Sequence, residues 1–181
     1  VGKTSIARIL AHEINGLPYT DESTHLDIIE IDAASNNSVE DIRDLRDKVQ
    51  ITPTSSPKKI YIIDEVHMLS KSAFNALLKT LEEPPEHVVF ILATTDADKL
   101  PATILSRVQR FNFRAISPRD AAKHLAFIAE QEKIAITPDA LELIAKQGKG
   151  SFRDSISLLD QLRSLSDETI DRTMVAEVLG L

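Results

Sequence analysis

The sequence contains no cysteine, only five glycines and few aromatic residues, which make up 4% of its 181 positions. Without cysteine the chain has no disulfide and no thiolate metal site. No apolar stretch approaches eighteen residues and no signal peptide is visible, so we expect a soluble, cytoplasmic protein that makes no use of a membrane. The hydrophobic share of 43% predicts an aliphatic core of ordinary size.

The chain also has no excess of positively charged residues. The formal net charge of −7 argues against a protein that binds DNA through bulk positive charge, so any contact with DNA must be local. The length suits one medium domain or two small ones.

A phosphate-binding pattern opens the chain. Val1-Gly2-Lys3-Thr4 matches the end of G-x-x-x-x-G-K-[ST], in which backbone N–H groups surround the phosphates, the lysine reaches them and the hydroxyl binds Mg²⁺. The apolar residues that follow fall at helical spacing and place this pattern at a helix N-terminus, where phosphates bind; they are Ile6, Ile9, Leu10 and Ile14. Taken alone, Gly2-Lys3-Thr4 is better explained as a chance tripeptide at a helix start, and the residues that follow change that balance.

The first part of that pattern and the strand that feeds it would precede residue 1, and the chain lacks an initiator methionine, so we expect a trimmed chain. Charge-assisted hydrogen bonds contribute about 1.5–3 kcal/mol each, so losing three or so N–H donors would remove roughly 4–9 kcal/mol. A micromolar ligand binds with only about −8 kcal/mol. We therefore expect these residues alone to bind ATP poorly or not at all.

An acidic pair follows a buried strand about sixty residues after the phosphate-binding pattern. Lys59–Asp64 is a continuous apolar run that ends in Asp64-Glu65. Phosphoryl transfer needs a metal-holding carboxylate, which suits Asp64, and a group that positions or deprotonates water, which suits Glu65. Thr94-Thr95 ends the next strand, where a hydroxyl can orient that water. A surface acidic pair and simple strand-end capping are the alternatives.

Helix and strand patterns alternate in the first two thirds of the chain and predict a parallel sheet with crossover helices. The last third predicts helices alone, so we place an α/β domain at residues 1–114 and a helical domain at 115–181. The expected strands are 26–32, 59–64, 88–93 and, as a possible last one, 110–113. The expected helices are 3–15, one from residue 38 onward, one that Pro84-Pro85 ends, 101–105, 117–131, 137–147, 151–164 and 171–179, with a polar connector at 16–25.

The longer motifs resemble the gamma/tau subunits of bacterial DNA polymerase III over nearly the whole chain. The most specific run is Phe74–His87, which reads FNALLKTLEEPPEH, and the others are Glu30–Asn36, Asp64–Leu69, Leu92–Thr95 and Ile104–Phe111. That family supplies the ATPase of the clamp loader, an AAA+ machine. The resemblance implies an AAA+ P-loop NTPase fold with a small all-helical lid domain.

Site residues also follow from the resemblance. Its Walker A residues correspond to Gly2, Lys3, Thr4 and Ser5, which would contact ATP, with Thr4 also binding Mg²⁺. The Walker B pair corresponds to Asp64, a magnesium ligand, and the catalytic Glu65, and the sensor 1 residue is Thr95. Two arginines of the family also have counterparts here. Arg107 matches the one that acts in trans on ATP held by a neighbouring subunit, and Arg153 matches the one that reaches the phosphates from the lid.

The chain departs from the family at three points. The family's four-cysteine zinc module is missing, and residues 16–25 are too few to hold it, so we expect no zinc; the five histidines are scattered. Val108 stands where the family has the cysteine that follows the motif arginine. The third, ring-forming collar domain is absent from these 181 residues.

The implied partners are other clamp-loader subunits in a heteropentameric ring, a sliding clamp and primer–template DNA, with Arg43 and Lys79 as candidate backbone contacts. Both could equally be solvated charges on amphipathic helices. The implied function is ATP hydrolysis that loads the clamp during replication, associated with DNA-directed DNA polymerase.

Two alternatives stay open. One is a non-catalytic stator subunit that donates Arg107, although Lys3, Thr4, Asp64 and Glu65 are all retained. The other is a helicase module, since Asp64-Glu-Val-His67 fits the DExH string, although the helical last third does not resemble a second motor domain.

Overall fold

The computed structural model describes residues 2–20, 25–165 and 168–181. The chain divides into two compact units, Gly2–Phe111 and Asn112–Leu181, close to the sequence-based boundary between residues 114 and 115. Part of the expected connector at 16–25 and Val1 of the phosphate-binding pattern lie outside the described residues. Each unit is considered by itself.

The first unit is built on a parallel sheet of β1 (Ile28–Asp32), β2 (Lys59–Asp64) and β3 (Val88–Leu92), in the order β1-β2-β3. Asp32 is paired with Asp64, and Ile63 with Leu92, so the three strands end together. The central strand β2 is fully buried from residue 60 to residue 63. A strand covered on both faces needs an unbroken apolar run, which explains its sequence.

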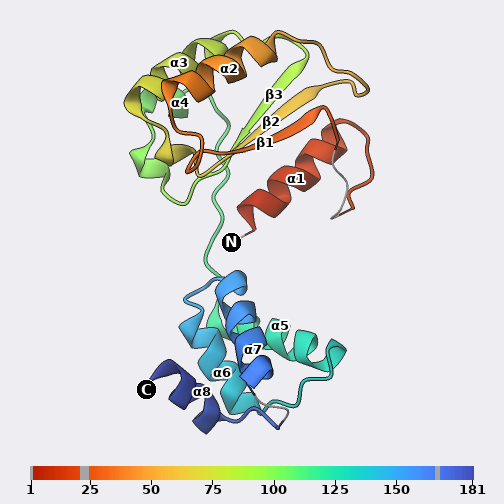
Figure 1. The fold of residues 1–181 in the computed structure, drawn as a ribbon, viewed down its shortest axis with the longest axis vertical. Coiled ribbons are helices and arrows are strands. Elements are labelled where there is room, and N and C mark those ends of the chain that lie inside the picture. The colour runs from red at the N-terminus through yellow and green to blue at the C-terminus, as the bar shows by residue number, and fades with distance from the viewer. Residues whose placement is uncertain (1, 21–24, 166–167) are drawn as a thin grey trace. The chain divides into compact units, whose positions relative to one another are not determined.

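Helices cover both faces of this sheet (Figure 1). Alternate residues of β2 point to opposite faces, and Ile60 and Ile62 pack against the buried alanines of α1 (Lys3–Ile14). Tyr61 and Ile63 pack on the other face, in the core formed by α2 (Val39–Val49) and α3 (Lys71–Glu82). The sheet is therefore the middle layer of three.

Local capping sets where these helices begin. Ser38 and Asp41 form a reciprocal capping box at the start of α2, and the Ser70 hydroxyl accepts a hydrogen bond from the N–H of Ala73 in α3. The remaining elements of the unit are α4 (Ala102–Leu105) and two single 3-10 turns, η1 (Val66–Met68) and η2 (Ala97–Lys99).

The possible last strand at residues 110–113 is wrong, because these residues form no strand. Phe111 and Phe113 alternate as strand residues do, yet they are 69% and 43% exposed. A strand requires a neighbouring strand for its backbone hydrogen bonds, and in the described sheet β3 pairs only with β2. The alternating pattern alone cannot supply that partner.

The second unit consists of helices: α5 (Pro118–Gln131), α6 (Pro138–Gln147), α7 (Phe152–Leu165) and α8 (Arg172–Leu179). Pro118 and Pro138 occupy the first turn of their helices, as predicted. Its core contains Leu125, Ile144 and Leu159, each nearly or fully inaccessible to solvent. The α/β unit with its parallel sheet and the helical unit together confirm the predicted fold class.

Among the helices described, none has the length and apolar character needed to cross a membrane.

A buried carboxylate holds the loop that leads into β2. Asp27 is 1% exposed and accepts hydrogen bonds from the N–H groups of Thr54, Ser55 and Ser56 and from the Ser55 hydroxyl, at 2.7 to 3.1 Å. Burial raises the pKa of Asp27, but these hydrogen bonds outweigh burial and bring the pKa from 3.8 to about 2. The ionised side chain is thus the form that the fold prefers.

We expect Asp27→Asn to lower the free energy of unfolding at neutral pH by about 2 kcal/mol, the amount that linkage assigns to this lowered pKa. A carboxyl with a lowered pKa stabilises the fold fully above its unfolded pKa, and this stabilisation is lost as the pH falls through its folded pKa. The difference between wild type and variant should therefore shrink between about pH 4 and pH 2 in urea unfolding curves.

The matched control is Asp44→Asn, because the Asp44 side chain is exposed and makes no hydrogen bond or ion pair within the described residues. This variant should stay within about 0.5 kcal/mol of wild type at every pH. A loss in Asp27→Asn that is the same at pH 7 and near pH 2 would contradict the assigned role.

Candidate functional site

The start of α1 and the end of β2 meet in one hydrogen bond. The hydroxyl of Thr4 donates to Oδ2 of Asp64 at 2.7 Å, across sixty residues of sequence. Helix α1 begins at Lys3, directly after Gly2, whose φ of 80° is left-handed. Asp64 is the last residue of the central strand, so the sheet presents its carboxylate at the carboxyl end where parallel sheets bind ligands.

The two oxygens of this contact fit a magnesium ion. Mg²⁺ prefers hard oxygen ligands in an octahedron at about 2.0–2.1 Å, so two adjacent ligands lie roughly 2.9 Å apart. The separation between Thr4 Oγ1 and Asp64 Oδ2 is 2.7 Å. In the described residues no cluster of three or more His, Cys, Asp or Glu side chains forms a closed metal cage. Magnesium bound with a nucleotide needs only one or two protein ligands.

The backbone of Glu65 is strained. Its φ of 49° and ψ of 42° are left-handed, a conformation that costs a non-glycine residue about 1–2 kcal/mol. Its N–H donates to Oδ1 of Asp64 at 3.0 Å. Strain of this kind persists only where surrounding contacts hold it, and it is common at functional sites.

Those surrounding contacts come from the end of β3. Thr95 donates its hydroxyl to Oε2 of Glu65 at 2.9 Å and its N–H to the same oxygen at 3.2 Å. The backbone also joins the two strand ends, because the N–H of Val66 donates to the carbonyl of Ala93 at 3.0 Å. The structure therefore brings together four of the predicted residues: Thr4, Asp64, Glu65 and Thr95.

Sequence reasoning missed His67 as part of this group. Its Nδ1 lies 3.3 Å from Oε2 of Glu65 and 2.8 Å from Oγ1 of Thr94. The sequence placed it among the scattered histidines and in the DExH string at residues 64–67, and neither pattern gave it a contact with Glu65. The available signal was its position two residues after Glu65, in a turn that follows a strand end.

The other residues of the phosphate-binding pattern surround Thr4 in sequence. Lys3 is half-buried and its ammonium forms no ion pair in the part of the chain that the structure describes. Ser5 is exposed in the first turn of α1. An unpaired cation and the free N–H groups of a helix N-terminus both favour a bound anion such as a phosphate.

Arg107 lies apart from these residues. Its guanidinium forms an ion pair with Glu82 at the end of α3, at 2.7 Å, and donates to the carbonyl of Thr103 at 2.6 Å. None of its contacts involves Thr4, Asp64 or Glu65.

Arg153 belongs to the second unit, in the first turn of α7, where it is exposed. The turn before it is tightly built around two glycines. A Cβ on Gly148 would lie 1.8 Å from Oγ of Ser155, and Gly150 has a φ of +84° with Ala115 2.8 Å from its missing Cβ. These constraints fix where α7 begins and hence the position of Arg153 within its own unit.

Arg43 and Lys79 are exposed on α2 and α3, two helices that pack side by side (Figure 1). Neither makes an ion pair among the described residues. Both side chains are therefore accessible cations.

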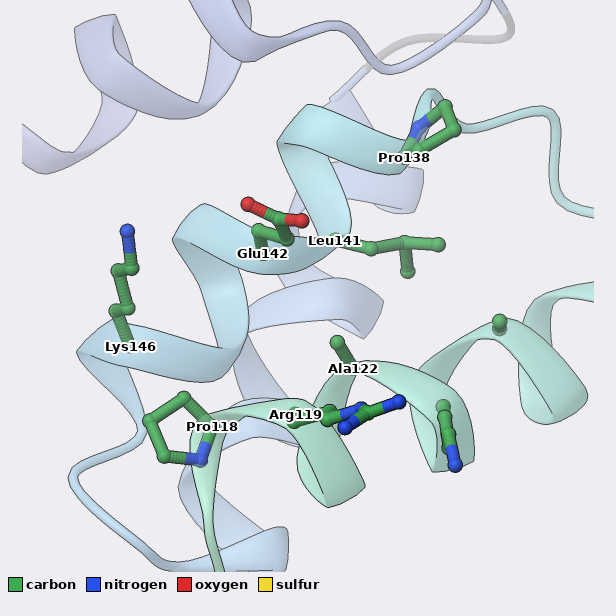
Figure 2. Close-up of a pocket in the computed structure, with 9 residues that line it drawn as sticks. Pro118, Arg119, Ala122, Pro138, Leu141, Glu142 and Lys146 are labelled. Carbon is green, nitrogen blue, oxygen red and sulfur yellow. The ribbon is translucent and has the colours of Figure 1, made fainter.

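A hollow of about 460 Å³ lies between α5 and α6 in the second unit. Figure 2 shows Ala122 and Leu141 facing the space between the two helices, with Arg119, Glu142 and Lys146 around it. None of the site residues that the sequence predicted is among the residues that line it.

Comparison with known families gives two matches. Residues 3–117 match the family described as "DNA polymerase III, delta subunit", and residues 120–167 match "DNA polymerase III clamp loader subunit, ATPase lid domain". The boundary between them falls close to the division between the two units.

Individual relatives agree with the second description. The tau/gamma subunit of DNA polymerase III from Haemophilus influenzae is 48% identical over 100% of this chain and 28% of its own length. The tau subunits from Escherichia coli and Bacillus subtilis are each 48% identical, over 99% and 93% of this chain and 30% and 32% of their own lengths. The chain thus spans about a third or less of these relatives.

Solved structures support the fold. The RuvB Holliday junction branch migration motor from Thermotoga maritima matches with a TM-score of 0.73 over 99% of this chain and 58% of that one, at 20% identity, which is evidence for fold alone. A gamma subunit-related protein from the same organism matches with a TM-score of 0.60 over 90% of this chain and 53% of that one, at 26% identity.

The strain at Glu65 is testable by comparing two small replacements. Glycine tolerates the left-handed conformation and alanine does not, so we expect Glu65→Gly to be more stable than Glu65→Ala by about 0.5–1 kcal/mol. Free energies of unfolding from denaturant titration measure the difference. At Asp44, inside α2, the order should reverse by about 1 kcal/mol. If the alanine variant were the more stable one at both positions, Glu65 would not be strained.

Proposed function

This chain belongs to the DNA polymerase III gamma/tau family of clamp-loader subunits, and from that premise we propose that it carries the ATPase site of such a subunit. The proposed reaction is hydrolysis of ATP with Mg²⁺, coupled to loading a sliding clamp on primer–template DNA during replication. The observation that carries the proposal is the 2.7 Å contact between Thr4 and Asp64, because it joins the phosphate-binding helix to the acidic strand end.

Residues at the start of α1 would bind the triphosphate. Gly2 and Ser5 would contribute backbone N–H groups at the helix N-terminus, and Lys3 would reach the β- and γ-phosphates. Thr4 and Asp64 would hold Mg²⁺, which would supply positive charge to offset the negative charge that develops on the phosphates during hydrolysis. We propose no role for zinc.

Glu65 would orient and deprotonate the attacking water. A general base must lie within hydrogen-bond reach of the proton that it removes, and a carboxylate next to the magnesium ligand has that reach. Thr95, already hydrogen-bonded to Glu65, would sense the γ-phosphate from the end of β3. Because Thr95 contacts Glu65 directly, a shift of Thr95 on nucleotide binding would also shift the Glu65 carboxylate.

Two arginines outside this group of residues would also take part in the reaction. Arg107 would act in trans on ATP held by the neighbouring subunit of a heteropentameric ring, where an arginine finger contributes about 10³–10⁵ in kcat. Its ion pair with Glu82 is between half-exposed side chains, and such pairs contribute about 0–1 kcal/mol, so the guanidinium can be released at little cost. Arg153 would reach the phosphates from the lid.

Contacts with DNA would come from Arg43 and Lys79, acting on the phosphate backbone. The net negative charge of the chain requires such contacts to be local, and Arg43 and Lys79, exposed on two adjacent helices, satisfy that requirement. We place the protein in the bacterial cytoplasm, where replication takes place.

A non-catalytic clamp-loader subunit is the second candidate, and one observation favours it. Residues 3–117 match a family that is described by the delta subunit. A subunit without turnover has no need to keep the lysine, hydroxyl and two carboxylates of the site, and this chain keeps Lys3, Thr4, Asp64 and Glu65. The helicase alternative has the DExH string at residues 64–67 in its support, whereas the likeness to RuvB, at 20% identity, concerns the fold alone.

The test is Glu65→Gln in the full-length protein, assembled with its partner subunits. We expect ATP turnover to fall by at least about 10²-fold, because a general base contributes 10²–10⁴, while ATP binding stays unchanged. Lys3→Ala is the matched control and should weaken ATP binding itself. Phosphate release and fluorescent-nucleotide binding measure the two effects. Wild-type turnover in Glu65→Gln would contradict the assignment, and no turnover in the wild type would favour the non-catalytic candidate.

A further inference from the structure

We propose that His67 is a positioning residue, which together with Thr95 immobilises one carboxylate oxygen of Glu65 so that the other oxygen faces the attacking water. This inference rests on the proposed ATPase function and concerns the same site. It assigns a role to the one side chain of the constellation that the mechanism above does not use.

The donors around Glu65 all converge on the same oxygen. Oε2 receives the hydroxyl of Thr95 at 2.9 Å, the N–H of Thr95 at 3.2 Å and lies 3.3 Å from Nδ1 of His67. In the part of the chain that the structure describes, no contact reaches Oε1. A carboxylate oxygen has about two lone-pair directions, so Oε2 is saturated while Oε1 keeps its full capacity as an acceptor.

The contacts of His67 fix where its proton lies. Oγ1 of Thr94 accepts a hydrogen bond from the N–H of Asp96 at 3.0 Å and lies 2.8 Å from Nδ1 of His67. A bare Nδ1 lone pair would face the anionic Oε2 of Glu65, which is repulsive. A proton on Nδ1 instead satisfies Thr94 and Glu65 together, so the geometry selects the form of His67 that donates from Nδ1.

His67 is also more buried than the carboxylate that it contacts. Its side chain is 10% exposed, whereas that of Glu65 is 34% exposed. The ring is anchored to the end of β3 through Thr94 and sits in the tight turn η1, where the N–H of Met68 donates to the carbonyl of Glu65 at 2.8 Å. A long, half-exposed carboxylate would otherwise sample several rotamers, and the imidazole restricts it to one.

Restriction of this kind affects turnover rather than binding. Water attack requires the base within about 2.6–3.2 Å and in the correct direction, and a misplacement of about 1 Å can cost 10²-fold in rate. The triphosphate itself would be held by residues of α1, which His67 does not contact. Loss of His67 should therefore lower kcat and leave the affinity for ATP unchanged.

The experiment uses the full-length protein in its assembly, with kcat from steady-state phosphate release and the Kd for ATP from fluorescent-nucleotide binding. We expect His67→Leu to lower kcat by about 10–100-fold with Kd within about twofold. His67→Asn, whose amide nitrogen takes the place of Nδ1, should recover kcat to within about threefold of wild type. His67→Gln places its amide nearer the position of Nε2 and should stay low.

The matched control is His87→Leu. His87 belongs to the same unit and also hydrogen-bonds to a neighbouring element, through Nε2 to the carbonyl of Val49 at 3.1 Å, but it makes no contact with Glu65. Its kcat should stay within about twofold of wild type, and thermal unfolding midpoints of all variants report any loss of the fold separately.

The outcomes separate the two levels of the proposal. The role of His67 is overturned if His67→Leu keeps a kcat within twofold of wild type, or if His67→Gln is as active as His67→Asn. In either case the ATPase assignment stands as long as turnover in the wild type depends on Glu65. Equal losses in kcat and ATP affinity would make His67 a structural residue and overturn it too. A wild-type assembly without Glu65-dependent turnover overturns the proposed function and this inference with it.

Discussion

The hydrogen bond between Thr4 and Asp64 is the contact on which the organisation of the site depends. It forms because three parallel strands end together and because α1 packs its small buried residues, Ala7 and Ala11, directly on the sheet. Larger side chains at those positions would push the helix outward and separate the hydroxyl from the carboxylate. Packing in the core thus sets the distance between the Thr4 hydroxyl and the Asp64 carboxylate. That distance determines whether one ion can bind both groups.

The acidic end of β2 is held by polar contacts rather than by burial. Glu65 keeps a left-handed backbone, and its side chain is bound by Thr95 and approached by His67. A strained residue is maintained only by its surroundings, so the ends of β2 and β3 behave as one unit. If a bound nucleotide altered the position of Thr95, the Glu65 carboxylate would move with it, which would connect the nucleotide physically to the proposed base.

Much of this could be read from the sequence, and the limits have physical causes. The unbroken apolar run of β2 predicted a buried parallel strand, and parallel strands place Asp64 and Thr95 at one edge without further information. The strand at 110–113 failed because pairing depends on a neighbour that no local pattern specifies. His67 and the Glu82 partner of Arg107 were missed because each contact joins residues that only the folded chain brings together.

The account's central claim is that Thr4 and Asp64 act on one magnesium ion within one triphosphate pocket. A double-mutant cycle on the Mg²⁺-dependent affinity for ATP, with Thr4→Val, Asp64→Asn and the double variant in the full-length protein, tests it most directly. Because two ligands of a shared ion lose their effect together, we expect the double variant to be little worse than either single one, with a coupling energy on the order of 1–3 kcal/mol. Simple addition of the two losses would show that the residues act independently and would contradict the shared pocket.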